Sequence, residues 1–400
     1  MEMKMAAQES WLAEQAGRRR VGSGAYGPAD KKLVCWAEGP TWFEGTAADD
    51  GPNWWRKYLN WMKYRHTEGY LAGSQPFEGA VFATRGQVIF DAKSDFNKRV
   101  RILQHEEFRV LRLQQTLHSI AVVDTVNYLN PAAAPILPDK LVLGYIRAMV
   151  AAAAAFCALT SWGDADSCDL RLPGQSMLCI GVGGGSLPLF MARHFSNLHV
   201  WAVDIDPVVI RAAQQLMGMG GVPVQVWQPG DQASHQQAGL IIEMADAQDV
   251  MSDLAERIHR GIARGQSAIC MDTYDGDAGI PAHLAAPAFM QLCAACLHPQ
   301  GTLVVNLFNG YALSTEREAS MDFVANAHDF FSQVYTIKVA DSPYNMIMAH
   351  RPAYLSTRAI MRAADEIGKQ AGFEWDAQDE VRDVFITELD DMETVVELRA

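Results

Sequence analysis

Strand-like and helix-like segments alternate along residues 177–307, and this alternation restricts the possible folds more than any other feature of the chain. Short apolar runs separated by longer helical stretches are typical of βαβ units, which build a parallel sheet. We expect a doubly wound, mostly parallel, seven-stranded Rossmann-like α/β sheet. Its parallel strands are expected at residues 177–180, 199–203, 239–244, 268–271 and 302–307, with a closing antiparallel pair at residues 334–339 and 345–349.

The rest of the chain divides into segments that differ in composition and in the secondary structure expected for them. Residues 1–72 form an N-terminal aromatic arm, and residues 73–165 form a small β-hairpin region plus a helix at residues 140–160. Residues 166–355 are the expected nucleotide-binding domain, and residues 356–400 a helical, acidic C-terminal extension. Within the small β region, short runs rich in Val, Ile and Phe predict antiparallel strands at residues 80–83, 87–91, 100–104, 108–113 and 119–123.

Composition limits the partners and the compartment. Thirty-three basic and 47 acidic residues give a net charge of −14, which disfavours nucleic acid as a partner. The apolar run at residues 141–159 contains Arg147 and five consecutive alanines, so a buried helix is expected and no membrane span. Seven scattered cysteines and the lack of a secretory signal favour an intracellular, soluble protein, cytoplasmic or organellar after loss of a transit peptide. Cys293 and Cys296 are expected in the core, so no metal site is predicted.

The aromatic segment at residues 54–61 would expose several large rings as an isolated helix. Two interpretations remain open. The segment packs on its own domain, or it contacts another chain, in a homodimer or in a larger protein assembly.

A glycine-rich loop, Gly181-Val-Gly-Gly-Gly185, follows the first parallel strand and precedes a helix. Glycines permit a tight turn and let a ligand approach the backbone, and the amides of the helix N-terminus then face that ligand. The third glycine of the dinucleotide pattern is replaced by Ser186. An NAD site stays open, but the spacing favours S-adenosylmethionine.

Acidic residues follow three further strands. Asp204 ends the next strand, Asp246 ends the third, and Asp272 and Asp275 follow the fourth. Ligands bind at the carboxyl ends of strands in doubly wound sheets, although acids at strand ends are also common helix caps. The agreement of all these positions favours one ligand site.

These motifs, together with Ile280-Pro281 and residues 296–307, resemble the spermidine synthase-like branch of the class I S-adenosylmethionine-dependent methyltransferase superfamily. The resemblance covers about residues 80–350. It implies that S-adenosylmethionine or decarboxylated S-adenosylmethionine is the cofactor. The implied cofactor-binding residues are Gly181, Gly183, Gly185, Asp204, Ile205, Asp246 and Ala247, with Asp204 on the ribose and Asp246 on the adenine amino group. Asp272 and Asp275 match an acidic pair that holds and deprotonates an amine, and His118 and Tyr274 belong to the implied substrate site.

Two departures concern the substrate site. His118 replaces the family's glutamine, and Tyr145-Ile-Arg147 stands where a Tyr-His-Glu element is expected, so Arg147 would repel a polyamine. Methyl transfer to an unidentified acceptor, small molecule or protein, is therefore favoured. The alternatives are aminopropyl transfer from decarboxylated S-adenosylmethionine to a diamine, and a noncatalytic subunit that docks through its aromatic arm.

Overall fold

The computed structural model describes residues 86–114, 116–125, 127–128, 130, 133–159, 167–228, 239–274, 279–308, 315–339, 345–350 and 354–386. All of these belong to one compact unit, residues 65–400. The predicted arm at residues 1–72, with its aromatic segment, and the expected strand at residues 80–83 lie outside the described residues.

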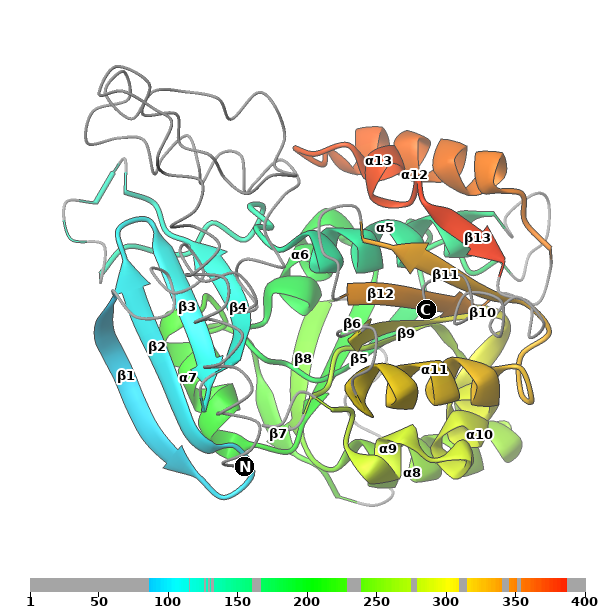
Figure 1. The fold of residues 1–400 in the computed structure, drawn as a ribbon, viewed down its shortest axis with the longest axis horizontal. Helices are drawn as coiled ribbons and strands as arrows, with labels where there is room; N and C mark the ends of the chain where they lie inside the picture. The colour runs from blue at the N-terminus through cyan, green and yellow to red at the C-terminus, as the bar shows by residue number, and fades with distance from the viewer. Residues whose placement is uncertain are drawn as a thin grey trace, which may run out of the picture. The chain divides into compact units, whose positions relative to one another are not determined.

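The described elements follow the predicted order, first a small all-β region and then alternating strands and helices (Figure 1). The strands are β1 (Gln87–Ser94), β2 (Lys98–His105), β3 (Phe108–Leu113), β4 (Thr116–Val122), β5 (Ser176–Ile180), β6 (His199–Asp204), β7 (Val224–Val226), β8 (Gly239–Met244), β9 (Gln266–Met271), β10 (Leu297–Phe308), β11 (Val334–Lys338), β12 (Asn345–His350) and β13 (Val384–Ile386). The helices are α5 (Gly144–Ala158), α6 (Ser186–His194), α7 (Pro207–Leu216), α8 (Ala247–His259), α9 (Ala282–Ala285), α10 (Pro287–Cys296), α11 (Thr315–Ala327), α12 (Thr357–Ala371) and α13 (Ala377–Glu380).

The larger sheet has the order β13-β11-β12-β10-β9-β5-β6-β8-β7. Strands β7, β8, β6, β5, β9 and β10 pair in parallel, whereas β12 is antiparallel to both β10 and β11, as the closing pair predicted. The sheet has nine strands among the described residues where seven were expected. The two additions, β7 and β13, are three-residue edge strands, too short to produce an apolar pattern.

Helices cover both faces of this sheet. Helices α5 and α12 lie on one side, and α8, α10 and α11 lie on the other (Figure 1). Every residue of α5 is buried, because its run of alanines lets the helix approach the sheet closely. The expectation of a buried helix at residues 140–160 is therefore confirmed, with bounds of Gly144–Ala158. Within the described ranges, no helix combines the length and the apolar character that a membrane crossing needs.

A buried ion pair attaches the C-terminal segment to α5. Arg147 donates through Nε to Glu380 of α13 at 2.9 Å, and their side chains are only 3% and 7% exposed. The guanidinium also donates to the carbonyls of Leu141 and Val142. The prediction that Arg147 would repel a polyamine at the site is wrong, because its charge is neutralised in the core by Glu380.

The small region forms a four-stranded antiparallel sheet of order β1-β2-β3-β4. Its first strands pack on α7, where the Arg211 guanidinium lies 5.8 Å from the centre of the Phe90 ring. On β4, Ser119 is buried with its Oγ 3.1 Å from Oγ of Ser186, the first residue of α6. The small sheet thus contacts the helices that follow β5 and β6, next to the glycine loop.

Removing one partner of the buried pair should destabilise the protein strongly. Glu380→Ala leaves the Arg147 charge buried and uncompensated, so we expect the free energy of unfolding to fall by about 3–5 kcal/mol in urea titrations. Arg147→Met/Glu380→Leu removes both charges and should recover much of that loss. The matched control is Glu366→Ala on α12. Glu366 forms an exposed pair with Arg362, so its loss should lower the free energy of unfolding by about 0.5 kcal/mol or less. A Glu380→Ala variant as stable as the control variant would contradict this assignment.

Candidate functional site

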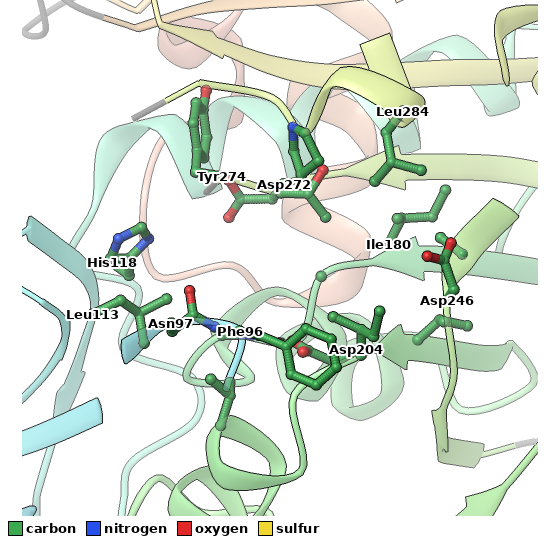
Figure 2. A pocket seen from close by; sticks show the side chains of 18 of the residues that line it. Phe96, Asn97, Leu113, His118, Ile180, Asp204, Asp246, Asp272, Tyr274 and Leu284 are labelled. Atoms are coloured by element: carbon green, nitrogen blue, oxygen red, sulfur yellow. Dashed lines mark hydrogen bonds between the residues drawn. The ribbon is translucent and has the colours of Figure 1, made fainter. Parts of the chain in front are cut away.

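The order of the larger sheet reverses at β5, which pairs with β6 on one side and β9 on the other. Crevices for ligands form at the carboxyl ends of the strands beside such a switch point. A cavity of about 260 Å³ lies there, slightly smaller than the usual small-molecule pocket of about 300–1,000 Å³. Its lining comes from the ends of β5, β6, β8 and β9, from the small sheet, and from α7 and the α9 segment (Figure 2).

The glycine loop forms one wall of the cavity, and its glycines have different neighbours. A Cβ on Gly181 would lie 2.3 Å from the backbone oxygen of Asp272, and one on Gly185 would lie 2.2 Å from the sulfur of Met219. Gly183 has φ +50° and nothing within 4 Å of its virtual Cβ. Gly181 and Gly183 line the cavity, whereas Gly185, the N-cap of α6, faces Met219 and is not among the lining residues.

Asp204, at the end of β6, holds this loop. Its Oδ2 accepts from the backbone N–H of Val182 at 2.9 Å and of Gly183 at 3.4 Å, and its Oδ1 accepts from the N–H of Asp206. Burial raises the pKa of Asp204, and the backbone donors oppose that shift. A carboxylate has about four acceptor positions, so it can still accept from a ligand hydroxyl.

Two acids after β6 and β8 each cap the helix that follows. Asp206 and Asp246 are the N-caps of α7 and α8 and accept from backbone amides in the first turn. Asp246 also lines the cavity, and its Oδ2 lies 3.3 Å from Nε2 of His283. Ile205 and Ala247, beside these acids, contribute apolar lining.

Asp272 lies at the other end of the cavity, on the segment after β9. Its Oδ1 accepts from Nδ2 of Asn306 at 2.9 Å, and its Oδ2 lies 3.3 Å from the Tyr145 hydroxyl. Burial raises the pKa of Asp272, while these two donors oppose the shift. Asp272 is therefore a partly buried carboxylate that lines the cavity and is a stronger base than an exposed aspartate.

Two further predicted residues surround Asp272. Burial lowers the pKa of His118 to about 4, so its imidazole is neutral at pH 7, and its Nε2 has no hydrogen-bond partner among the described residues. The Tyr274 hydroxyl donates to the backbone oxygen of Asn306 at 2.7 Å, and burial raises its pKa. In Figure 2, His118, Asp272 and Tyr274 occupy one end of the cavity and Asp246 the other, with Asp204 between them.

The structure brings together all but two of the predicted site residues. Gly181, Gly183, Asp204, Ile205, Asp246, Ala247, Asp272, His118 and Tyr274 line the cavity. Gly185 does not, and Asp275 lies outside the described residues. Phe96, Asn97 and His283 also line the cavity, and Tyr145 and Asn306 contact Asp272; none of these roles was predicted from the sequence. No sequence motif identifies these positions. The family resemblance did draw attention to Tyr145-Ile-Arg147, which lies on α5, the helix that carries Tyr145 to Asp272.

Two glycines of the loop should respond differently to alanine. Gly181→Ala forces a Cβ into the Asp272 backbone, so it should cost about 3 kcal/mol or more from overpacking and backbone strain together. Gly183→Ala adds a methyl to open space and should cost only about 1 kcal/mol, for its left-handed backbone. Thermal and urea unfolding of both variants would check this ranking, and equal losses would contradict it.

Comparisons with known proteins agree with this architecture. No protein-family model matches the chain. The chain is 30% identical over 138 residues to the eEF1A lysine and N-terminal methyltransferase of Bos taurus, a match that covers 33% of this chain but only 17% of that relative. It is 28% identical over 240 residues to the polyamine aminopropyltransferase of Chromobacterium violaceum, covering 60% of this chain and 76% of the relative.

Among solved structures, a probable spermidine synthase from Corynebacterium glutamicum matches with a TM-score of 0.51. The match covers 78% of this chain and 93% of that one at 14% identity, which is a likeness of fold. The chain is thus similar in sequence to methyltransferases and to a polyamine aminopropyltransferase, and its fold is the Rossmann-like methyltransferase fold that the probable spermidine synthase also has.

Proposed function

We propose that this protein is an S-adenosyl nucleotide-dependent transferase that moves a methyl group to the nitrogen of an amine acceptor. The observation that carries the proposal is the convergence of the glycine loop, Asp204, Asp246 and Asp272 on one cavity at the switch point of the sheet.

The residues present fit an S-adenosyl nucleotide. The space beside Gly183 is open to a ligand, and Asp204 next to it retains acceptor capacity for ribose hydroxyls. Asp246 would accept from the adenine amino group, with Ile205 and Ala247 against the base. Gly185 would contribute through the shape of the loop, since its Cα faces Met219.

The donor chemistry requires little of the protein beyond positioning. Bound S-adenosylmethionine supplies an electrophilic methyl group on its sulfonium. Asp272 would orient a protonated amine at the end of the cavity and accept its proton, which frees the nitrogen lone pair for attack on the methyl carbon. The S–CH₃ bond then breaks and S-adenosylhomocysteine is the leaving group. His118 and Tyr274 would form the walls around this nitrogen, and Asp275 is proposed as the second acid on the same segment.

The charge of the lining supports an amine acceptor. The acidic groups among the described lining residues are the carboxylates of Asp204, Asp246 and Asp272. The lining also contains two histidines, and His118 is neutral at pH 7. That lining attracts a cation and disfavours an anionic acceptor. The bovine relative is named for lysine and N-terminal methylation, and both of those acceptors are amines.

Aminopropyl transfer to a diamine is the second candidate. Tyr145 places its hydroxyl 3.3 Å from Oδ2 of Asp272, and the burial of Arg147 against Glu380 removes the repulsion expected for a polyamine. The match to the aminopropyltransferase also spans more of this chain than the match to the methyltransferase. This reaction would use the same carboxylate on the same kind of nucleophile.

Calorimetric titration with S-adenosylmethionine, decarboxylated S-adenosylmethionine and methylthioadenosine tests the proposal. Tighter binding of S-adenosylmethionine than of its decarboxylated form supports methyl transfer, and the reverse order supports aminopropyl transfer. Binding of none of the three would contradict both and leave the noncatalytic subunit as the function to pursue.

Asp246→Asn should weaken the binding of all three ligands by roughly tenfold or more, because a hydrogen bond to a charged acceptor is lost. Asparagine is as good an N-cap as aspartate, so the stability of α8 should be retained. The matched control is Asp249→Asn, an exposed acid in the same helical turn that does not line the cavity. Equal affinities of the two variants would exclude the adenine role of Asp246.

Asp272→Asn should lower turnover by about 10²- to 10⁴-fold while nucleotide binding persists. In the wild type, turnover should fall as the pH drops through the raised pKa of Asp272, above the ordinary aspartate value of 3.8. Folding raises this pKa, so above the raised pKa the ionised Asp272 lowers the free energy of unfolding. Below pH 3.8 the carboxyl is protonated in both the folded and the unfolded state, and it has no such effect. Asp272→Asn should therefore melt no lower than the wild type at pH 7, and a lower melting temperature together with lost nucleotide binding would indicate a structural role instead.

A further inference from the structure

Phe96 is an aromatic side chain left partly uncovered at the cavity. It sits in the turn between β1 and β2, lines the cavity and is 52% exposed. Ile205, which lines the same cavity from the end of β6, is 39% exposed. Large apolar side chains exposed together at a concave site mark a surface that a ligand covers.

The turn that carries Phe96 is fixed in place. Ser94 Oγ accepts from the backbone N–H of both Phe96 and Asn97 at 3.0 Å and donates to Oδ2 of Asp206. Asn97 Nδ2 donates to the same oxygen at 2.7 Å. Asp206 is fully buried and caps α7. The exposure of the Phe96 ring is therefore a property of a well-anchored turn.

The same network reaches the glycine loop. The backbone N–H of Asp206 donates to Oδ1 of Asp204, and Oδ2 of Asp204 holds Val182 and Gly183. Phe96 and Asp204 both line the cavity, and in the view of Figure 2 they appear between the Asp246 end and the His118 end. The turn that carries Phe96 is thus joined through Asp206 to Asp204, the residue proposed to bind the ribose, and among the described residues no hydrogen bond joins it to Asp272.

We propose that Phe96 packs against the nucleoside of the bound S-adenosyl ligand, so that the small antiparallel sheet supplies one wall of the nucleotide site. This inference rests on the proposed function. A flat aromatic ring covers apolar ligand surface with little loss of conformational entropy and binds a base or ribose face without hydrogen bonds. Phe96 is then a binding residue for every ligand that contains the nucleoside, whatever group it transfers.

Titration of the full chain with methylthioadenosine and with S-adenosylhomocysteine tests the proposal. Both ligands contain the nucleoside and an uncharged thioether, and only the second carries the amino acid portion. Phe96→Ala should weaken both by a similar factor, on the order of tenfold, whereas Phe96→Tyr keeps the ring and should retain affinity. The matched control is Val88→Ala, an apolar residue on β1 that is 47% exposed and does not line the cavity.

The outcomes separate the inference from the proposed function. Wild-type binding of both ligands with an unchanged affinity of Phe96→Ala would overturn the role of Phe96 alone. A loss for S-adenosylhomocysteine without a loss for methylthioadenosine would also overturn it, because the contact would then lie outside the nucleoside. A wild-type protein that binds neither ligand would contradict the proposed function and this inference together. Thermal unfolding of each variant checks that Phe96→Ala folds, and a Phe96→Tyr variant with tenfold weaker binding would count against the wall that we propose.

Discussion

The shape of the site depends on the hydrogen bonds between the Asp204 carboxylate and the backbone of the glycine loop. The carboxylate accepts backbone hydrogen bonds from both the loop and the start of the next helical segment, and it is partly buried. Burial alone would favour the protonated acid, so the amide donors are what make a charged group tenable there. Through Asp206 the same set of bonds reaches the β1–β2 turn. The loop, the edge of the larger sheet and the small sheet are thereby fixed relative to one another by Asp204 and Asp206.

The loop also shows that a glycine-rich motif combines two requirements. Gly181, Gly184 and Gly185 are crowded by Asp272, Ser119 and Met219, so their lack of a side chain serves packing between parts of the protein. Gly183 is crowded by nothing and leaves space open to the cavity. The motif in the sequence could not separate these cases, because the neighbours that distinguish them come from distant segments of the chain.

Features set by local sequence were predictable, and those set by distant contacts were not. Buried runs such as residues 177–180 and 199–203 identified the central strands, and the acids after them lie at the cavity because parallel strands end at one edge. The edge strands β7 and β13 were not predicted, because three residues are too few to show the alternation of apolar and polar side chains that identifies a strand. Phe96 reaches the cavity only through the docking of the small sheet. Arg147 was placed on the correct helix, but its partner lies 233 residues away, beyond any pattern of spacing.

That separation between Arg147 and Glu380 has a consequence for how the protein is made. During synthesis the chain leaves the ribosome N-terminus first, at about 5–20 residues per second, and early segments begin to fold before later ones exist. Helix α5 emerges long before α13, so its arginine has no counter-charge when the alanine-rich surface around it first becomes available to the sheet. Docking α5 at that stage would bury an unpaired cation. Docking of α5 is therefore less favourable until residue 380 has been synthesised.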